Sequence, residues 1–125
     1  MAQTKKHIVL DLDQTLIAAE TPADFAKFSS EIQKQKEHFA ENNTVYKMDD
    51  DFIVFERPHL QEFLTYIFEN FIVSVWTAAS KNYAIFIIKN IILKDKDKNG
   101  NKYHPRKINH MFVIFYFKII FIITQ

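Results

Sequence analysis

One glycine, Gly100, and no cysteine among 125 residues are the counts that most constrain this chain. Dinucleotide-binding turns and phosphate-binding P-loops need several glycines, because the backbone must approach the phosphate closely, so both are excluded. Without cysteine the chain cannot form disulfides, thiolate zinc sites or a cysteine nucleophile. Any phosphate chemistry in this chain must therefore depend on other groups.

The composition is that of one globular domain. Hydrophobic residues make up 48% of the chain and charged residues 25%, and the formal net charge is +1. Such a balance argues against direct binding to nucleic acid, which requires clustered basic residues. Only a three-residue apolar run, at 8–10, precedes Asp11, so we predict no signal peptide and an intracellular location, nuclear or cytoplasmic. The sequence does not indicate an oligomeric state.

Apolar periodicity predicts alternating strands and helices. In chain order, we expect a strand at 8–12, a helix at 22–40, a hairpin of strands at 44–48 and 52–55 with an acidic turn, a helix from Pro58, a strand at 71–76 and a helix from Ser80 to about 93. A strand, helix, strand, helix order is typical of an α/β fold with parallel strands. We place Phe71 and Trp76 in its core.

Candidate functional residues fall where two of these strands end. Asp11 and Asp13 stand at the end of the first strand, and Thr77 follows the strand at 71–76. Ligands of parallel α/β sheets bind beyond the carboxyl ends of the strands. We therefore expect all three residues at one ligand-binding edge.

The last third of the chain has a different character. Residues 94–107 form a charged segment, and residues 111–123 are almost entirely apolar apart from Lys118. A membrane-spanning helix needs about 20 apolar residues, which this run does not reach. We expect a buried or edge strand of the same sheet and no membrane contact, with a tail anchor as the alternative.

Residues 95–100 open like a calcium-binding loop, with Asp95, Asp97 and Asn99 as the first ligands. The twelfth position of such a loop should be a bidentate glutamate, and here it is Arg106. We therefore expect a solvated hairpin loop, in which Gly100 serves a left-handed turn, and no calcium site.

The strongest chemical signal is the string DLDQTL at residues 11–16. A strand-end aspartate can accept a phosphoryl group when a divalent cation offsets the charge of the phosphate. A carboxylate two residues later can protonate the leaving group. Aspartates in this spacing also occur simply as turn residues, and the spacing alone leaves both readings open.

Three segments together carry a resemblance. Residues 11–16, the string RPHLQEFL at 57–64 and the string WTAASKNYA at 76–84 occur in the order of the motifs of the haloacid dehalogenase superfamily. They are most similar to its NLI-interacting-factor-like branch, the phosphatases of the RNA polymerase II C-terminal domain. The similarity covers about residues 8 to 84.

The resemblance implies a haloacid-dehalogenase-like (Rossmannoid) parallel sheet, with a hairpin and helical insertion after the first strand. It also implies a Mg²⁺-dependent phosphatase of phosphoserine or phosphothreonine proteins or peptides. Asp11 would be the nucleophile and a metal ligand, and Asp13 the acid and base, with its carbonyl facing the metal. Thr77, through its hydroxyl, and the amide of Ala78 would hold phosphoryl oxygens, and Thr15 would order the loop.

One departure from the family pattern concerns the end of the chain. The family has a lysine and then an acidic pair downstream of its second motif, whereas no Asp or Glu follows Asp97 here. We therefore expect residues 1–93 to form part of a phosphatase domain truncated at its C-terminal side, with residues 94–125 as a charged loop and apolar tail. The alternative function is a non-catalytic binding or scaffold module with the same fold.

Overall fold

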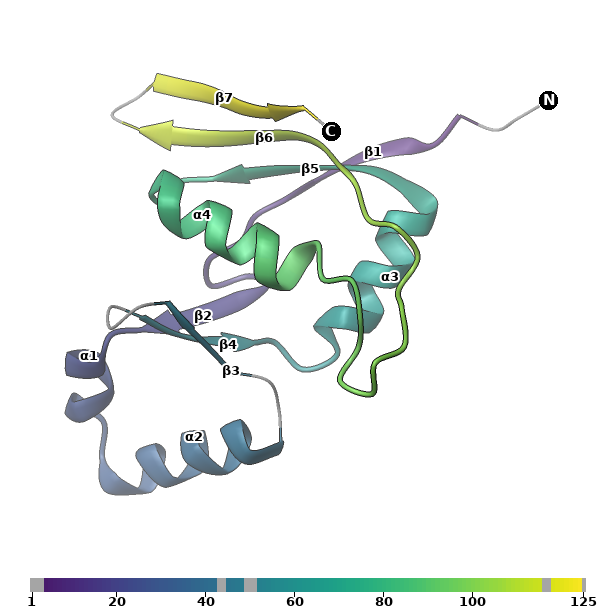
Figure 1. The fold of residues 1–125 in the computed structure, drawn as a ribbon. Helices are drawn as coiled ribbons and strands as arrows, with labels where there is room; N and C mark the ends of the chain where they lie inside the picture. Colours follow the sequence, from purple (N-terminus) through teal and green to yellow (C-terminus); the bar gives the residue numbers. More distant parts are fainter. Residues whose placement is uncertain (1–3, 43–44, 49–51, 116–117, 125) are drawn as a thin grey trace. The chain divides into compact units, whose positions relative to one another are not determined.

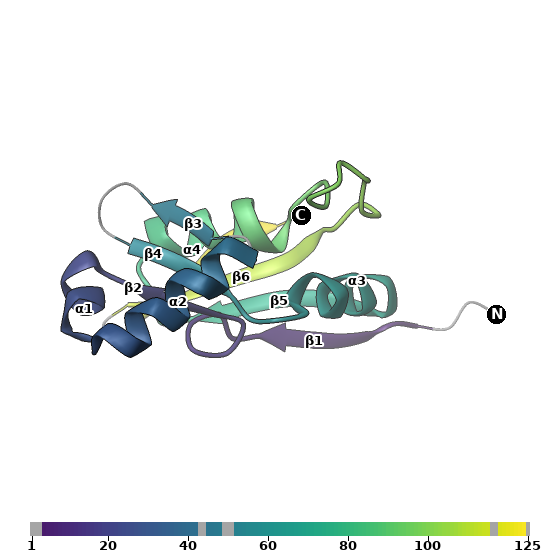
Figure 2. The same ribbon diagram turned by 90° about the horizontal axis from the view of Figure 1, so that it is seen from below.

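The computed structural model describes residues 4–42, 45–48, 52–115 and 118–124. The chain forms two compact units, shown in two views in Figures 1 and 2. The first unit combines the segment up to Leu12 with the chain from His59 onward, and the second unit is Asp13–Pro58.

The first unit contains a four-stranded sheet. Its strand order is β1-β5-β6-β7, in which β1, β5 and β6 are parallel and β7 is antiparallel to β6. The strands are β1 (Lys6–Leu10), β5 (Phe71–Thr77), β6 (Ile108–Phe115) and β7 (Lys118–Thr124). This confirms the predicted α/β fold and shows that the apolar run forms strands. Within the described part of the chain, no helix is long and apolar enough to cross a membrane.

The helices of this unit, α3 (Leu60–Asn70) and α4 (Lys81–Ile87), lie on the same face of the sheet, as Figure 1 shows. Right-handed crossovers produce this arrangement, because the chain moves in one direction from β1 to β5 to β6. Leu64 and Val75 are fully buried, one on α3 and one on β5. The buried residues of α3 are Leu60, Leu64 and Ile67, whereas Phe63 is 42% exposed.

Both helices of the first unit differ slightly from the expected bounds. The predicted helix from Pro58 begins at Leu60, because His59 has a left-handed backbone with a φ of 64°. Ser80 caps α4 as expected, and its hydroxyl accepts the Tyr83 N–H at 3.4 Å. The expected helix continues beyond α4 as one π-helical turn, Ile88–Ile92.

The placement of Trp76 in the core was wrong. Alternation along β5 turns Val75 and Thr77 to the buried face, so Trp76 points to the other face and is 39% exposed. There its ring lies 5.4 Å from the ring of Phe112 on β6.

The charged segment before β6 is a small hairpin loop, as expected. The Asp97 carboxylate accepts the N–H groups of Asn99 and Asn101 at 2.8 and 2.9 Å. The Asn101 N–H contributes most to holding the pKa of Asp97 below its usual value of 3.8. Gly100 has a φ of 83°, so it takes the left-handed conformation that the turn requires.

Arg106 ties the end of this loop to α3. Its guanidinium donates to the Gln61 side chain at 2.7 Å and to the Thr65 hydroxyl at 3.1 Å. It also donates to the Ile92 carbonyl at 3.2 Å and stacks on the Tyr103 ring at 4.2 Å. Arg106, which stands where a calcium-binding loop requires glutamate, thus holds the end of the loop against α3.

The second unit is built on a three-stranded antiparallel sheet with the order β2-β4-β3. The strands are β2 (Ile17–Glu20), β3 (Val45–Met48) and β4 (Phe52–Glu56). The predicted hairpin is confirmed in β3 and β4, and its acidic turn at 49–51 lies outside the described residues. Strand β2 was not predicted, because four residues are too few to show a clear period.

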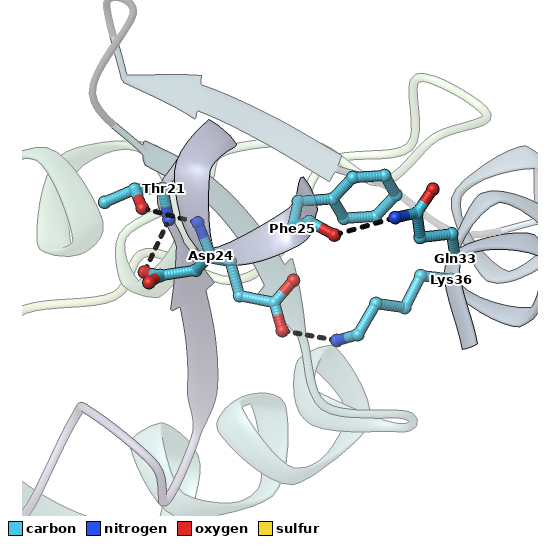
Figure 3. A network of polar contacts seen from close by, with 6 residues as sticks. Thr21, Asp24, Phe25, Gln33 and Lys36 are labelled. Carbon is cyan, nitrogen blue, oxygen red and sulfur yellow. Dashed lines mark hydrogen bonds and ion pairs between the residues drawn. The ribbon is translucent and has the colours of Figure 1, made fainter. Parts of the chain in front are cut away.

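The single helix expected at 22–40 is two helices, α1 (Pro22–Lys27) and α2 (Ser30–Asn42). The Ser29 hydroxyl accepts the Ile32 N–H at 3.3 Å and so starts a new helix. The Gln33 side chain donates to the Phe25 carbonyl at 3.1 Å, at the end of α1 (Figure 3), and also to the Phe28 carbonyl at 2.9 Å. The Gln33 amide thus satisfies two of the carbonyls at the break between the helices.

Two further polar contacts hold α1 and α2. At the start of α1, Thr21 and Asp24 form a reciprocal capping box (Figure 3). On α2, the Lys36 ammonium pairs with Glu20 and lies 4.8 Å from the Phe28 ring and 5.2 Å from the Phe55 ring.

Candidate functional site

In the first unit, the sheet places Asp11 and Thr77 at the same edge. Leu10 of β1 pairs with Val75 of β5 in parallel register. Asp11 is the next residue after β1, and Thr77 is the last residue of β5. Both therefore lie at the carboxyl ends of neighbouring parallel strands, where ligands of such sheets bind.

The turn after β5 has a defined hydrogen bond. The Thr77 hydroxyl oxygen accepts the Ala79 N–H at 3.1 Å, and Thr77 is 1% exposed. A hydroxyl that accepts one bond retains its own proton for donation. The neighbouring Ala78 is exposed. The turn thus presents a fixed hydroxyl next to an exposed main-chain segment.

Asp13 and Thr15 lie in a tight turn at the start of the second unit. Asp13 bridges to Ile17, and the Gln14 N–H donates to the Ile17 carbonyl at 2.9 Å. Asp13, Gln14 and Thr15 are exposed, whereas Leu16 and Ile17 are buried. The apolar pair anchors the turn and leaves the polar residues in solvent.

Chain connectivity, independent of the arrangement of the units, keeps Asp13 near Asp11. One residue, Leu12, separates them. Because a residue advances the chain by at most about 3.6 Å, their Cα atoms are no more than about 7 Å apart. Thus the structure brings Asp11 and Thr77 to one strand edge, and the chain itself holds Asp13 within two residues of Asp11.

The donor chemistry of the two aspartates suits Mg²⁺. Carboxylate and carbonyl oxygens are its preferred ligands, and in phosphoryl-transfer sites it often uses one or two carboxylates together with substrate phosphate and water. Among the residues that the structure describes, no group of three or more His, Cys, Asp or Glu could hold a metal. The carboxylate and carbonyl oxygens of Asp11 and Asp13 are therefore of the type that Mg²⁺ binds together with phosphate and water.

Nothing in the amino-acid sequence predicts the backbone conformation of Gln14. Its φ is 61°, a left-handed value uncommon for a residue with a Cβ. Glycine or asparagine would have indicated such a turn, whereas glutamine does not.

The sheet of the first unit, with parallel β1, β5 and β6, is that of a haloacid-dehalogenase-like α/β fold. The fold is similar to that of the fission yeast RNA polymerase II CTD phosphatase Fcp1, in a structure bound to beryllium fluoride, with a TM-score of 0.52 and 22% identity. That match covers 83% of this chain and 29% of the Fcp1 chain, and a second Fcp1 structure gives the same values. At this identity the likeness concerns the fold alone.

The chain belongs to the NLI interacting factor-like phosphatase family, whose sequence model matches residues 6–118. Strand β6 lies within the matched range, and β7 begins at its last residue.

Two viral proteins, each named CTD phosphatase-like protein 355R, are relatives. The one from invertebrate iridescent virus 3 is 52% identical over 94 residues, which are 75% of this chain and 48% of that protein. The one from invertebrate iridescent virus 6 is 46% identical over 104 residues, 83% of this chain and 50% of that protein. The chain thus spans about half the length of these relatives.

Proposed function

We propose that this protein is a Mg²⁺-dependent phosphatase of phosphoserine or phosphothreonine residues in proteins, acting through a phosphoaspartate. The observation that carries the proposal is the position of Asp11, directly after β1 and at the edge where β5 ends in Thr77. Membership in a phosphatase family supports this assignment.

In the first step, a carboxylate oxygen of Asp11 attacks the phosphorus of the phosphoester. The bond from phosphorus to the serine or threonine oxygen breaks, and the Asp13 carboxyl gives its proton to that oxygen. The phosphoryl group is then bonded to Asp11, and the substrate leaves as an alcohol.

In the second step, the Asp13 carboxylate takes a proton from water, and the water oxygen attacks phosphorus. The bond to Asp11 breaks and inorganic phosphate is released, which restores both aspartates. Throughout, the Thr77 hydroxyl and the Ala78 N–H donate to phosphoryl oxygens, and Thr15 orders the turn that carries Asp13. Mg²⁺ held by Asp11 and Asp13 would offset the negative charge that otherwise keeps a carboxylate and a phosphate apart.

The test is hydrolysis of a phosphoserine peptide by the full chain, with and without Mg²⁺. Asp11→Asn should lower kcat/KM by roughly 1,000-fold or more, because an amide is a poor nucleophile. Asp13→Asn should lower it by roughly 100-fold, the contribution of a general acid. Asp95→Asn, which changes an exposed aspartate of the hairpin loop, is the control and should retain activity. Turnover that survives Asp11→Asn would reject Asp11 as the nucleophile.

A second function is a non-catalytic module that binds phosphoproteins. It is motivated by the described residues, among which no group of three or more His, Cys, Asp or Glu could hold a metal ion. Saturable binding of the phosphoserine peptide without release of phosphate, at any Mg²⁺ concentration, would support this function. Mg²⁺-dependent turnover would eliminate it.

A further inference from the structure

The turn that carries Asp13 depends on a disfavoured backbone conformation. In the described ranges, Gln14 and His59 are the non-glycine residues with a positive φ, at 61° and 64°. In this region the Cβ crowds the backbone, and β-branched residues are tolerated least. At each of these two described positions, the surrounding structure indicates what the strained conformation contributes.

At His59 the gain is structural. This residue directly precedes Leu60, the first residue of α3, so its conformation sets the direction in which the helix starts. Neither His59 nor its neighbours contribute to the proposed chemistry.

At Gln14 the gain is the closure of the turn. The left-handed residue reverses the chain so that its N–H reaches the Ile17 carbonyl, while Asp13 bridges to Ile17. Ile17 is 3% exposed and pairs with Glu56 of β4. The backbone of Asp13 is therefore fixed to a buried residue of a sheet, although Asp13 itself is exposed.

We propose that Gln14 is a positioning residue, whose left-handed backbone holds Asp13 where it can donate and accept the proton. The proposal rests on the proposed phosphatase function. Because Gln14 is exposed, its contribution comes from the backbone conformation and not from packing. Displacement of a catalytic group by about 1 Å can cost roughly 100-fold in rate, so a small change in this turn has a large effect.

The experiment compares residues that tolerate or resist a positive φ. Gln14→Asn and Gln14→Gly keep the left-handed conformation accessible, whereas Gln14→Val opposes it. His59→Asn and His59→Val are the matched controls, because they introduce the same tolerant and intolerant residues at a left-handed position outside the proposed chemistry. For each variant of the full chain, kcat/KM is measured with a phosphoserine peptide and with p-nitrophenyl phosphate, and the melting temperature is recorded.

The two substrates separate a positioning role from a structural one. A serine alkoxide leaves only when protonated, whereas p-nitrophenolate leaves without a proton. At saturating Mg²⁺, which the proposed function also assigns to Asp13, Gln14→Val should therefore lower kcat/KM for the peptide by roughly 100-fold but for p-nitrophenyl phosphate by less than about threefold. His59→Val should lower the melting temperature and leave the ratio of the two kcat/KM values unchanged.

Several outcomes would overturn the proposal. An equal loss on both substrates in Gln14→Val would indicate general damage to the turn, and wild-type activity on both would show that the conformation does not matter. If Gln14→Val does not fold, Gln14→Gly still tests the proposal. This variant keeps the left-handed backbone, so a large loss of peptide hydrolysis would show that the Gln14 side chain, and not the backbone conformation, is required. A wild-type chain inactive on both substrates rejects the phosphatase function itself, and the positioning role with it.

Discussion

The two units are stabilised by different kinds of interaction. In the first unit, residues distant in sequence pair along parallel strands and bury a dense set of Ile, Leu and Val side chains, including Leu64, Val73 and Ile91. In the second unit, the buried apolar residues among those described are Leu16, Ile17 and Val54, and α1 has no buried residue. There, polar contacts around α1 and α2 supplement this smaller set of buried side chains.

This difference predicts which unit opens first. Local polar contacts at partly exposed positions each contribute little, whereas a fully buried aliphatic side chain contributes about 1.5–3 kcal/mol. We therefore expect backbone amides of the second unit to exchange hydrogen at lower denaturant concentrations than those of β1 and β5. Asp11 follows β1 in the more stable unit, and Asp13 opens the less stable one.

The largest expected effect comes from the core of the first unit. Leu64→Ala removes a fully buried side chain of α3 and should lower the free energy of unfolding by about 2–5 kcal/mol, measured by denaturant unfolding. Val54→Ala, in the fully buried position of β4, should cost about 2 kcal/mol, because fewer methyl groups are lost.

Phe63→Ala is the control for Leu64→Ala, because it truncates a large but partly exposed side chain on the same helix. It should cost less than about 1 kcal/mol. If Val54→Ala destabilised the protein as much as Leu64→Ala, the contrast between the units would not hold.

An intermediate effect is expected at the ion pair of the second unit. Lys36→Met leaves the Glu20 carboxylate, whose side chain is 13% exposed, without its partner, and should lower the free energy of unfolding by about 2 kcal/mol. The reason is that Oε2 of Glu20 is already buried and accepts no hydrogen bond from the described residues. Lys34→Met, at an exposed position of α2, should change stability by no more than roughly 0.5 kcal/mol. Equal changes in the free energy of unfolding for Lys36→Met and Lys34→Met would show that the Lys36–Glu20 ion pair does not contribute to stability.

The smallest effect concerns the capping box of α1. Hydrogen bonds from the Thr21 side chain and then its backbone hold the pKa of Asp24 below 3.8. A lowered pKa means that the ionised carboxylate stabilises the folded state. This stabilisation is present above pH 3.8 and is lost as the pH falls through the pKa of the folded state.

An NMR titration of the Asp24 carboxyl should therefore show a midpoint below 3.8 in the native chain, and Thr21→Ala should raise it toward 3.8. The same substitution should destabilise the helix start by about 1 kcal/mol, seen as faster amide exchange in α1 alone. A midpoint that does not move would contradict a role for Thr21.

The sequence predicted the features that depend on repeated patterns. Alternating strands and helices indicated the parallel sheet. Asp11 could be placed at the end of β1 because the apolar residues of the strand stop there and a charged residue follows. The features that the sequence did not predict depend on contacts with other segments. The apolar spacing of Phe25, Phe28 and Ile32 suggested one helix, but Ser29 starts a second one and Ile32 is 40% exposed.

Two other features of the structure have no sequence signal of their own. Strand β2 forms because β4 pairs with it, since a four-residue strand is not stable alone. The left-handed backbone at Gln14 arises because the turn must connect Asp13 to Ile17. In both cases the tertiary partner determines a conformation that the local residues do not prefer.

The two ends of the second unit lie next to each other. The Leu16 carbonyl accepts the Arg57 N–H at 3.1 Å, and Ile17 pairs with Glu56. An insertion whose entry and exit strands are paired can be lengthened, shortened or exchanged without changing the spacing of its attachment points. The length and sequence of this region can therefore vary during evolution while the first unit keeps its fold. In protein engineering, a different hairpin can be attached to the same pair of strands.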